Sequence, residues 1–191
     1  MISNKEYILV RAGIGKVNAA RTTQILIDKF DIEYIINLGS AGGLNDKLSI
    51  GDIVIGEKIV QHDFDVTAFG REKGFIPETG KFFESDIKLL NIFENINLDD
   101  AKILKGTIAS GDIFYTSNEL KQSIRKEFNA DCVEIEGAAI AQVCYLNNIP
   151  FVVIRSISDN ANNGAHMDYE KFTPIAVKNS TRILKAMLKK M

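Results

Sequence analysis

The sequence has little of what marks secreted, membrane-spanning or nucleic-acid-binding proteins. Its 191 residues include two cysteines, Cys132 and Cys144, both in apolar segments, so we expect reduced core thiols and a cytoplasmic location instead of a disulfide framework. No apolar run approaches the length of a membrane span, and the N-terminus does not have the pattern of a signal peptide. The net charge of -2 provides no field that would attract nucleic acid or an anionic membrane. A small molecule is therefore the expected partner.

Several catalytic and cofactor motifs are also missing. The chain has no GxxxxGK[ST] loop and no GxSxG elbow, and AGIGKVNAA does not have the third glycine of a dinucleotide-binding turn. His62 and His166 are isolated, and no cluster of Cys or His has the spacing of a zinc site. We therefore expect neither an organic cofactor nor a metal.

The residues that are present predict a single α/β domain over residues 1–191. With 46% hydrophobic and 25% charged residues, the chain can bury a substantial core. Apolar and glycine patterns predict strands and helices in alternation, with strands at 7–10, 34–38, 52–60 and 101–109 and helices at 16–30, 85–97, 117–128, 137–146 and 171–191. The glycine-rich segment 39–43 is predicted as a loop. This alternation favours a mostly parallel sheet flanked by helices in three layers.

The stretch from Asp131 to Asp159 carries the strongest functional signal. It is predicted to hold a strand that ends in two carboxylates, a helix of small residues, and an apolar strand whose far end leads into a loop that contains Arg155, Ser158 and a third acid, Asp159. Ligands of open α/β sheets bind at the carboxyl ends of strands, so these acids are candidates for chemistry. The alternative is structural: Glu134 and Glu136 would favour the N-terminus of the following helix, and Asp159 would cap a turn.

Several segments together resemble the 5′-methylthioadenosine/S-adenosylhomocysteine nucleosidases of the nucleoside phosphorylase superfamily. The similarity extends from Gly13 to the C-terminal helix through the segments GIGKVNAA, NLGSAGGL, GDIVI, HDFDVTAFG, SGDIFY, VEIEGAAIAQVC and PFVVIRSISD. The resemblance implies hydrolysis of the N-glycosidic bond of an adenine thionucleoside by a homodimer. It implies no metal and no organic cofactor.

The resemblance also implies roles for individual residues. Asp159 matches the acid that protonates the adenine ring, and its burial would have to raise a carboxyl pKa from about 3.9. Glu136 matches the carboxylate that binds the ribose hydroxyls. The other implied positions are Ser158 beside the acid, Glu134 and Ile135 at the ribose, Phe114 and Tyr115 at the adenine, Ser40 and Arg155 near the attacking water, Ile14 and Tyr169 at the alkylthio group, and Phe69 and Pro77 from the other subunit.

The sequence departs from the family's pattern in two places. Ile135 stands where the family often has Met, which preserves apolar volume. The first strand and helix of the family, which carry a water-activating glutamate, have no counterpart in the sequence, so we expect an N-terminally truncated domain with impaired turnover. Three functions remain open: a nucleosidase, a binding protein without catalysis, and a phosphorylase. Ile36-Asn37-Leu38 before the glycines contains no Arg for phosphate, which disfavours the phosphorylase.

Overall fold

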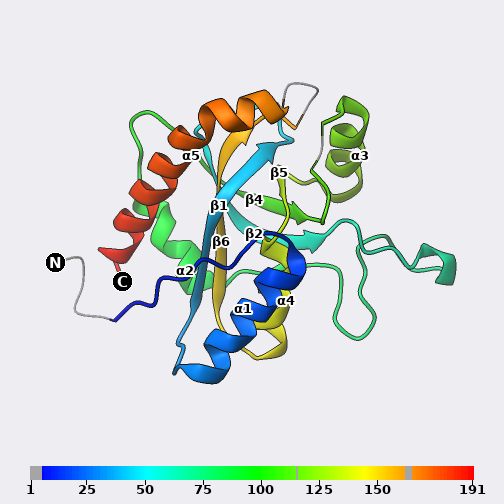
Figure 1. Cartoon of the computed structure of the whole chain (residues 1–191), viewed down its shortest axis with the longest axis horizontal. Coiled ribbons are helices and arrows are strands. Elements are labelled where there is room, and N and C mark those ends of the chain that lie inside the picture. Colours follow the sequence, from blue (N-terminus) through cyan, green and yellow to red (C-terminus); the bar gives the residue numbers. More distant parts are fainter. Residues whose placement is uncertain (1–5, 115, 162–164) are drawn as a thin grey trace.

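A computed structural model describes the backbone of residues 6–114, 116–161 and 165–191, and the side chains of the same ranges except 165–168 (Figure 1). The strands are β1 (Ile35–Gly43), β2 (Ile53–Gln61), β3 (Phe83–Glu84), β4 (Ile103–Ser110), β5 (Cys132–Glu134) and β6 (Phe151–Asp159). The helices are α1 (Lys16–Lys29), α2 (Ile87–Ile92), α3 (Asn118–Phe128), α4 (Gly137–Leu146) and α5 (Ala165–Leu188), with short 3-10 turns at η1 (Thr67–Phe69) and η2 (Phe93–Asn95). Within these ranges, no helix is both long and apolar enough to cross a membrane.

The strands form one mixed sheet that closes on itself into a barrel, so the predicted three-layer arrangement is wrong. The order is β3-β2-β4-β5-β1-β6, and the last strand, β6, also pairs with β2, which closes strands β2, β4, β5, β1 and β6 into a barrel with β3 at its edge. Pairs β1–β6, β2–β4 and β4–β5 are parallel, whereas β1–β5, β2–β3 and β2–β6 are antiparallel. The α/β class and the alternation of strands and helices are as predicted.

Gly56 lies at the point where β2 pairs with β4 on one side and with β6 on the other. Its backbone pairs with Gly106 of β4 and also with Val153 of β6. A Cβ at this position would lie 2.9 Å from Ile108 Cδ1 and 3.3 Å from the Val153 carbonyl oxygen, so a larger residue would push the strands apart. The β2–β4 register shifts directly after Gly56, and the shift bends β2 away from β6 towards β3.

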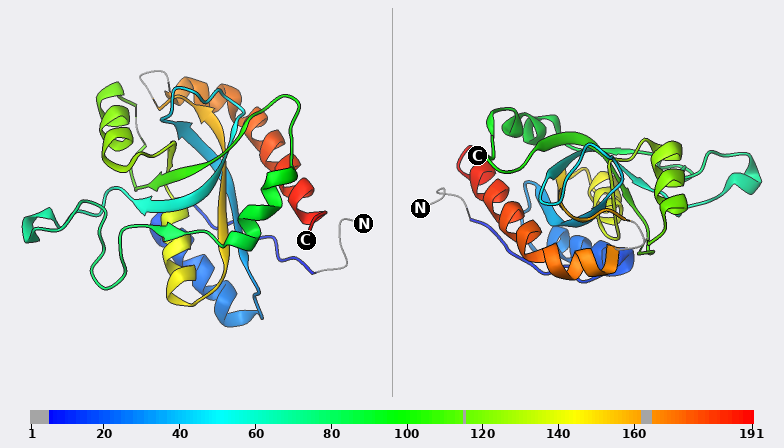
Figure 2. Two further views of the ribbon diagram at one scale, coloured as in Figure 1. Left: turned by 180° about the vertical axis from the view of Figure 1, so that it is seen from behind. Right: turned by 90° about the horizontal axis from the view of Figure 1, so that it is seen from above.

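Helices cover the barrel from several sides (Figure 2). Helix α4 packs on β4, β2 and β6 and also against α1, and its row of small residues allows this close approach. Helix α5 packs on β6 and β1 at another side. Helices α2 and α3 directly follow Asp86 and Ser117, whose side chains accept hydrogen bonds from first-turn backbone N–H groups, and both helices lie within the ranges predicted from the sequence.

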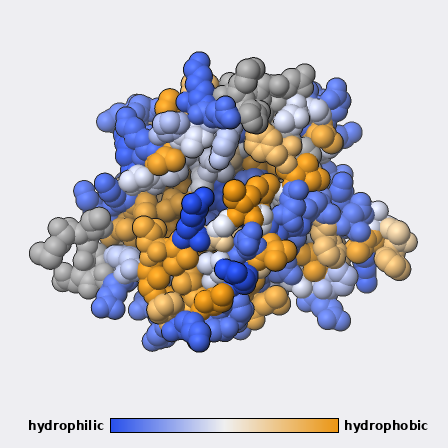
Figure 3. All heavy atoms as spheres, viewed as in Figure 1, coloured by the Kyte–Doolittle hydropathy of each residue, from blue (hydrophilic) through white to orange (hydrophobic). Residues whose placement is uncertain are grey.

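The segment 7–10 is not a strand, although the sequence predicted one there. In the part of the chain described, no backbone hydrogen bond joins this segment to a strand. Its side chains remain open to solvent, with Leu9 93% exposed. Figure 3, drawn in the view of Figure 1, shows apolar side chains gathered on the part of the surface where this segment runs. Strand propensity alone does not form a strand here because no neighbouring strand of the described ranges pairs with the segment.

The glycine-rich segment 39–43 belongs to β1 and is not the predicted loop. Strand β1 pairs with β6 along its length and with β5 at Gly42 and Gly43. The predicted close approach is nevertheless present, because a Cβ at Gly39 would lie 3.1 Å from Arg155 Cζ and one at Gly42 would lie 2.8 Å from Asp159 Oδ1. These glycines allow two functional side chains to lie directly against β1.

Candidate active site

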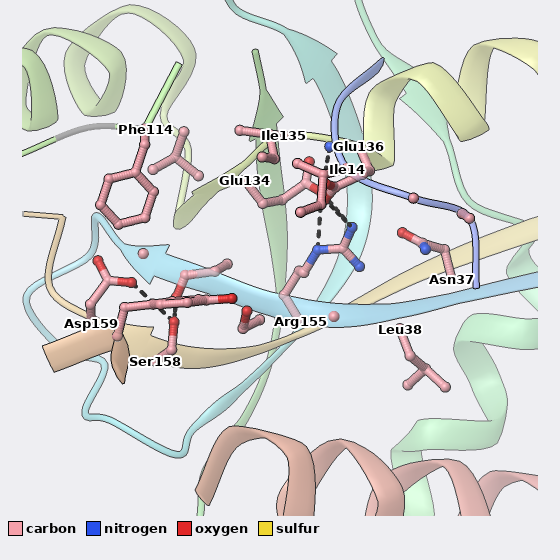
Figure 4. A pocket seen from close by; sticks show the side chains of 18 of the residues that line it. Ile14, Asn37, Leu38, Phe114, Glu134, Ile135, Glu136, Arg155, Ser158 and Asp159 are labelled. Atoms are coloured by element: carbon pink, nitrogen blue, oxygen red, sulfur yellow. Dashed lines mark hydrogen bonds and ion pairs between the residues drawn. The ribbon is translucent and has the colours of Figure 1, made fainter. Parts of the chain in front are cut away.

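One cavity of about 710 Å³ lies where β1, β5 and β6 approach the segment before α1 (Figure 4). Every residue proposed from the sequence as a site residue, except Tyr115, Phe69 and Pro77, lines this cavity. The proposed residues that line it are Ile14, Ser40, Phe114, Glu134, Ile135, Glu136, Arg155, Ser158, Asp159 and Tyr169. The volume is in the range of small-molecule binding sites.

Glu134 is buried, and its carboxylate is fully engaged by protein groups. It accepts hydrogen bonds from Ser110 Oγ, from the backbone N–H of Glu136 at 3.1 Å and of Gly137 at 2.8 Å, and from Arg155 Nε at 3.1 Å and Nη2. Burial raises the pKa of this carboxyl, but the guanidinium of Arg155 and the hydrogen bonds outweigh it and hold the pKa below its ordinary value. Glu134 is therefore ionised and holds the start of α4 in place, as the structural alternative for this residue predicted.

Arg155 lies on β6 and not in the loop that the sequence predicted after that strand. Its side chain is 1% exposed and forms a buried ion pair with Glu134, and Nη1 donates to the carbonyl oxygen of Ile154 at 3.0 Å. Buried charges are costly unless they are paired and hydrogen-bonded, and both conditions hold here. The guanidinium thus acts first as the partner of Glu134, and it also faces the cavity.

Glu136 is the residue before the first turn of α4, and it is held less tightly. Its Oε1 accepts a hydrogen bond from the Gly15 backbone N–H at 3.2 Å, and its Oε2 lies 4.0 Å from Arg155 Nη2. Burial and then the negative charge of Glu134 raise the pKa of Glu136 above its ordinary value, and Arg155 and the Gly15 N–H oppose this rise. Among the described residues no donor forms a hydrogen bond with Oε2, so Glu136 can bind a hydroxyl group of a ligand.

Asp159 ends β6 and is 2% exposed. Its Oδ2 lies 3.0 Å from Ser158 Oγ, and its Oδ1 accepts the backbone N–H of Ala161 at 2.8 Å, the contact that the capping alternative predicted. In Figure 4 its carboxyl group lies on the same side of the cavity as Phe114, whereas Glu136, Ile14 and Arg155 lie together in another part. The cavity therefore presents one acid beside an aromatic ring and a second acid beside a guanidinium.

Of the remaining predicted residues, some line the cavity and others lie away from it. Phe114 packs edge-on against Tyr169 with ring centroids 6.0 Å apart, and both line the cavity. Phe69 is 83% exposed and, like Pro77, belongs to a long segment between β2 and β3 that projects from the barrel at the right of Figure 1. Tyr115 lies outside the described residues.

The comparisons with known proteins identify the family. The model of the phosphorylase superfamily matches residues 1–189. The chain belongs to this superfamily.

Individual proteins of the superfamily give a more specific comparison than the family model. The chain is 42% identical over its whole length to the 5′-methylthioadenosine/S-adenosylhomocysteine nucleosidase of Staphylococcus aureus strain JH9, and it spans 85% of that protein. It is also similar to the nucleosidase of S. pneumoniae solved with a transition-state inhibitor, with a TM-score of 0.91 and 41% identity over 95% of this chain and 80% of that one. The futalosine hydrolase of Helicobacter pylori gives a TM-score of 0.91 at 38% identity, over 94% and 78% of the two chains. The resemblance inferred from the sequence motifs is confirmed.

Two residues of this phosphorylase-superfamily site were missed from the sequence. Ser110 donates to Glu134 and accepts the Ala138 backbone N–H at 2.7 Å, although no role of its own was predicted for this residue from the sequence. Asn37 lines the cavity, and its Oδ1 is buried with no hydrogen-bond partner among the described residues. A lone amide inside the apolar run of β1 was the available signal, because buried polar groups are normally paired.

Proposed function

We propose that the protein hydrolyses the N-glycosidic bond of 5′-methylthioadenosine and S-adenosylhomocysteine to adenine and a thioribose, as part of methionine and S-adenosylmethionine salvage in the cytoplasm. One observation carries the proposal: two buried or half-buried carboxyl groups, Asp159 and Glu136, lie in different parts of one cavity of about 710 Å³. The named activities of the relatives support the choice of substrate.

The reaction needs an acid and an anion in separate places. When the bond between C1′ and the purine breaks, its electron pair stays on adenine and positive charge develops on the ribosyl group. Asp159, beside Phe114, donates a proton to N7 of the leaving base. Glu136 accepts hydrogen bonds from the ribose hydroxyls and stabilises the cation through its negative charge. Water then adds to C1′ and loses a proton to give the free sugar.

Other residues hold these two acids in place. Glu134 and Arg155 fix the start of α4, from which Glu136 projects, and Ser158 orients Asp159 through the 3.0 Å contact. In this role Glu134 does not touch ribose itself, because its oxygens are engaged by protein donors. Ser40 and the cavity face of Arg155 border the water, Ile135 fills apolar space at the ribose, and Ile14 and Tyr169 border the alkylthio group. The activation of the attacking water is assigned to none of the described residues.

The proposal includes a homodimer in which the projecting segment contributes to the neighbouring site. Phe69, with most of its surface exposed, and Pro77 are the residues expected to contact the neighbour's alkylthio group. An aromatic side chain exposed on a projecting segment is typical of an interface. Sedimentation of the purified chain should give a dimer, and Phe69→Ala should raise KM for methylthioadenosine more than it lowers kcat. A monomer with unchanged KM would contradict this part.

The assay of the reaction itself distinguishes the alternatives. Purified protein is incubated with 5′-methylthioadenosine, S-adenosylhomocysteine or a futalosine-type nucleoside, and adenine or base release is followed by chromatography with and without phosphate. We expect adenine and a free thioribose, at a rate independent of phosphate. Phosphate-dependent release of a sugar phosphate would show a phosphorylase. Binding of adenine without any release would show a binding protein.

A further inference from the structure

A polar network lies beside the cavity but is not part of its wall. Lys16, the first residue of α1, donates from Nζ to both carboxylate oxygens of Asp63, at 2.7 and 2.9 Å, and to Gln61 Oε1 at 3.0 Å. The Lys16 and Asp63 side chains are only 19% and 18% exposed. Burial raises the pKa of Asp63, but the Lys16 hydrogen bond and other contacts outweigh it and leave that pKa lowered. Asp63 is therefore ionised, and its contact with Lys16 is more protected from solvent than a surface ion pair.

A third residue, Asp112, closes this network into a ring. The Asp112 backbone N–H donates to Asp63 Oδ2 at 3.0 Å, and Asp112 Oδ1 accepts the Lys16 backbone N–H at 2.8 Å. The ring thus connects the start of α1, the segment after β2 and the segment after β4. These segments are 47 to 96 residues apart in the chain.

Two residues of the ring, Lys16 and Asp112, are next in the chain to residues that contact or line the cavity. Gly15, next to Lys16, donates its backbone N–H to Glu136 Oε1 at 3.2 Å. Ile113 and Phe114 follow Asp112 and line the cavity, and Figure 4 shows Phe114 in the part that holds Asp159. A displacement of Asp63 would therefore move both the donor to Glu136 and the aromatic wall at the proposed base site.

We propose that the ring of Lys16, Asp63 and Asp112 positions the two halves of the active site relative to each other, with Asp63 as the central positioning residue. The proposal rests on the proposed nucleosidase function for its kinetic consequences. Asp63 touches neither substrate nor reacting atoms. Its effect passes through Lys16 and Gly15 to Glu136, and through Asp112 to Phe114.

The first test compares two variants that remove one partner each. Asp63→Asn places an amide donor against Lys16 Nζ or the Asp112 N–H, and Lys16→Met removes the ammonium group at similar length. We expect kcat/KM for methylthioadenosine to fall about 10- to 100-fold in each, because displacements near 1 Å cost about this much. In the double variant the loss should be no larger than in the worse single variant, since both changes break one unit. Losses that multiply, or rates within twofold of wild type, would overturn the proposal.

A matched pair on the surface is the control. Lys121 and Asp46 form a Lys–Asp ion pair at 3.0 Å away from the cavity. Lys121→Met and Asp46→Asn make the same chemical changes and should leave kcat/KM unchanged. Thermal unfolding of all variants shows whether a loss of rate merely follows a loss of folded protein.

The pH profile provides a readout that a purely structural role would not move. The groups facing Glu136 are Glu134 from β5, Arg155 from β6 and the Gly15 N–H before α1. Loss of the Gly15 donor removes a contact that lowers the pKa of Glu136, so in Lys16→Met the acid limb of kcat/KM should move to higher pH. An unmoved acid limb would contradict the path through Gly15.

Amide hydrogen exchange tests the ring without any turnover. The peptides containing Lys16 and Asp112 should exchange faster in Asp63→Asn than in wild type, and Asp46→Asn should leave them unchanged. If wild type releases no adenine, the nucleosidase proposal fails, whereas the exchange result still decides whether Asp63 holds these segments. Equal exchange in wild type and Asp63→Asn would overturn the positioning role.

Discussion

Arg155→Met should destabilise the fold by removing the charge that pairs with Glu134. Both side chains are almost completely buried, at 1% and 2% exposure. Breaking a buried pair by removing one partner costs about 3 to 5 kcal/mol. Because Glu134 keeps its bonds from Ser110 and the backbone N–H groups and can take up a proton, we expect the low end, about 3 kcal/mol at neutral pH. This corresponds to a fall in Tm of about 6 to 12 °C for a chain of this size.

The pH dependence of this loss tests its cause. In wild type the pKa of Glu134 is lowered, so its contribution to stability is fully present above the unfolded value of about 4.3 and is lost as pH falls through the folded pKa. Without Arg155, burial remains and raises this pKa, so the folded variant gains relative stability as pH falls. The difference in unfolding free energy between wild type and variant should therefore be smaller at pH 5 than at pH 7.5.

The assay is urea unfolding followed by circular dichroism at both pH values. Arg182→Met is the control, because Arg182 pairs with the exposed Asp100 at the surface and its loss should fall within the error of the measurement. A loss below about 1 kcal/mol for Arg155→Met, or a loss independent of pH, would refute the assignment of a buried, ionised Glu134.

Three further experiments test other contacts of the structure. If ionised Glu136 binds the ribose, kcat/KM should fall as pH decreases through the raised pKa of Glu136. Arg155→Met should move this acid limb of the pH-rate profile to higher pH, because Arg155 lowers the pKa of Glu136. An acid limb at the same pH in wild type and variant would count against the role. Gly42→Ala would place a Cβ 2.8 Å from Asp159 Oδ1 and should displace this carboxyl group. We expect kcat to fall about 100-fold in the adenine-release assay. A rate near that of wild type would show that the reaction tolerates a displacement of Asp159. Asp86→Ala removes the side-chain cap of α2 and should cost about 1 kcal/mol in urea unfolding with kcat unchanged; no loss of stability would contradict the capping role.

Local features of the fold could be predicted from the sequence because their causes are local. The helices that begin after Asp86 and Ser117 have capping side chains next to their apolar faces, and the structure begins both helices there. The closure of the barrel could not be predicted in the same way. It depends on the pairing of Gly56 with Val153, two residues far apart in the chain whose strand propensities do not specify a neighbour.

The site, like the fold, could be predicted from the sequence only in part. Carboxylates at strand ends pointed to Glu136 and Asp159, and the family resemblance supplied their roles. The distinction between Glu134 and Glu136 required the structure, because only the positions of Arg155 and Ser110 show that one carboxylate is engaged and the other is open to a ligand. The ring around Asp63 left no local pattern, since each of its contacts joins distant segments.

Single-turnover release of adenine from 5′-methylthioadenosine by Asp159→Asn tests the central claim most directly. Asparagine preserves the shape of the side chain but cannot donate a carboxyl proton to the leaving base. Asp52→Asn is the control, because Asp52 is also buried but binds the Ser49 and Lys102 backbone N–H groups outside the cavity. We predict that Asp159→Asn lowers the rate by at least about 100-fold while Asp52→Asn keeps the wild-type rate constant per folded molecule. An unchanged rate in Asp159→Asn would contradict the account.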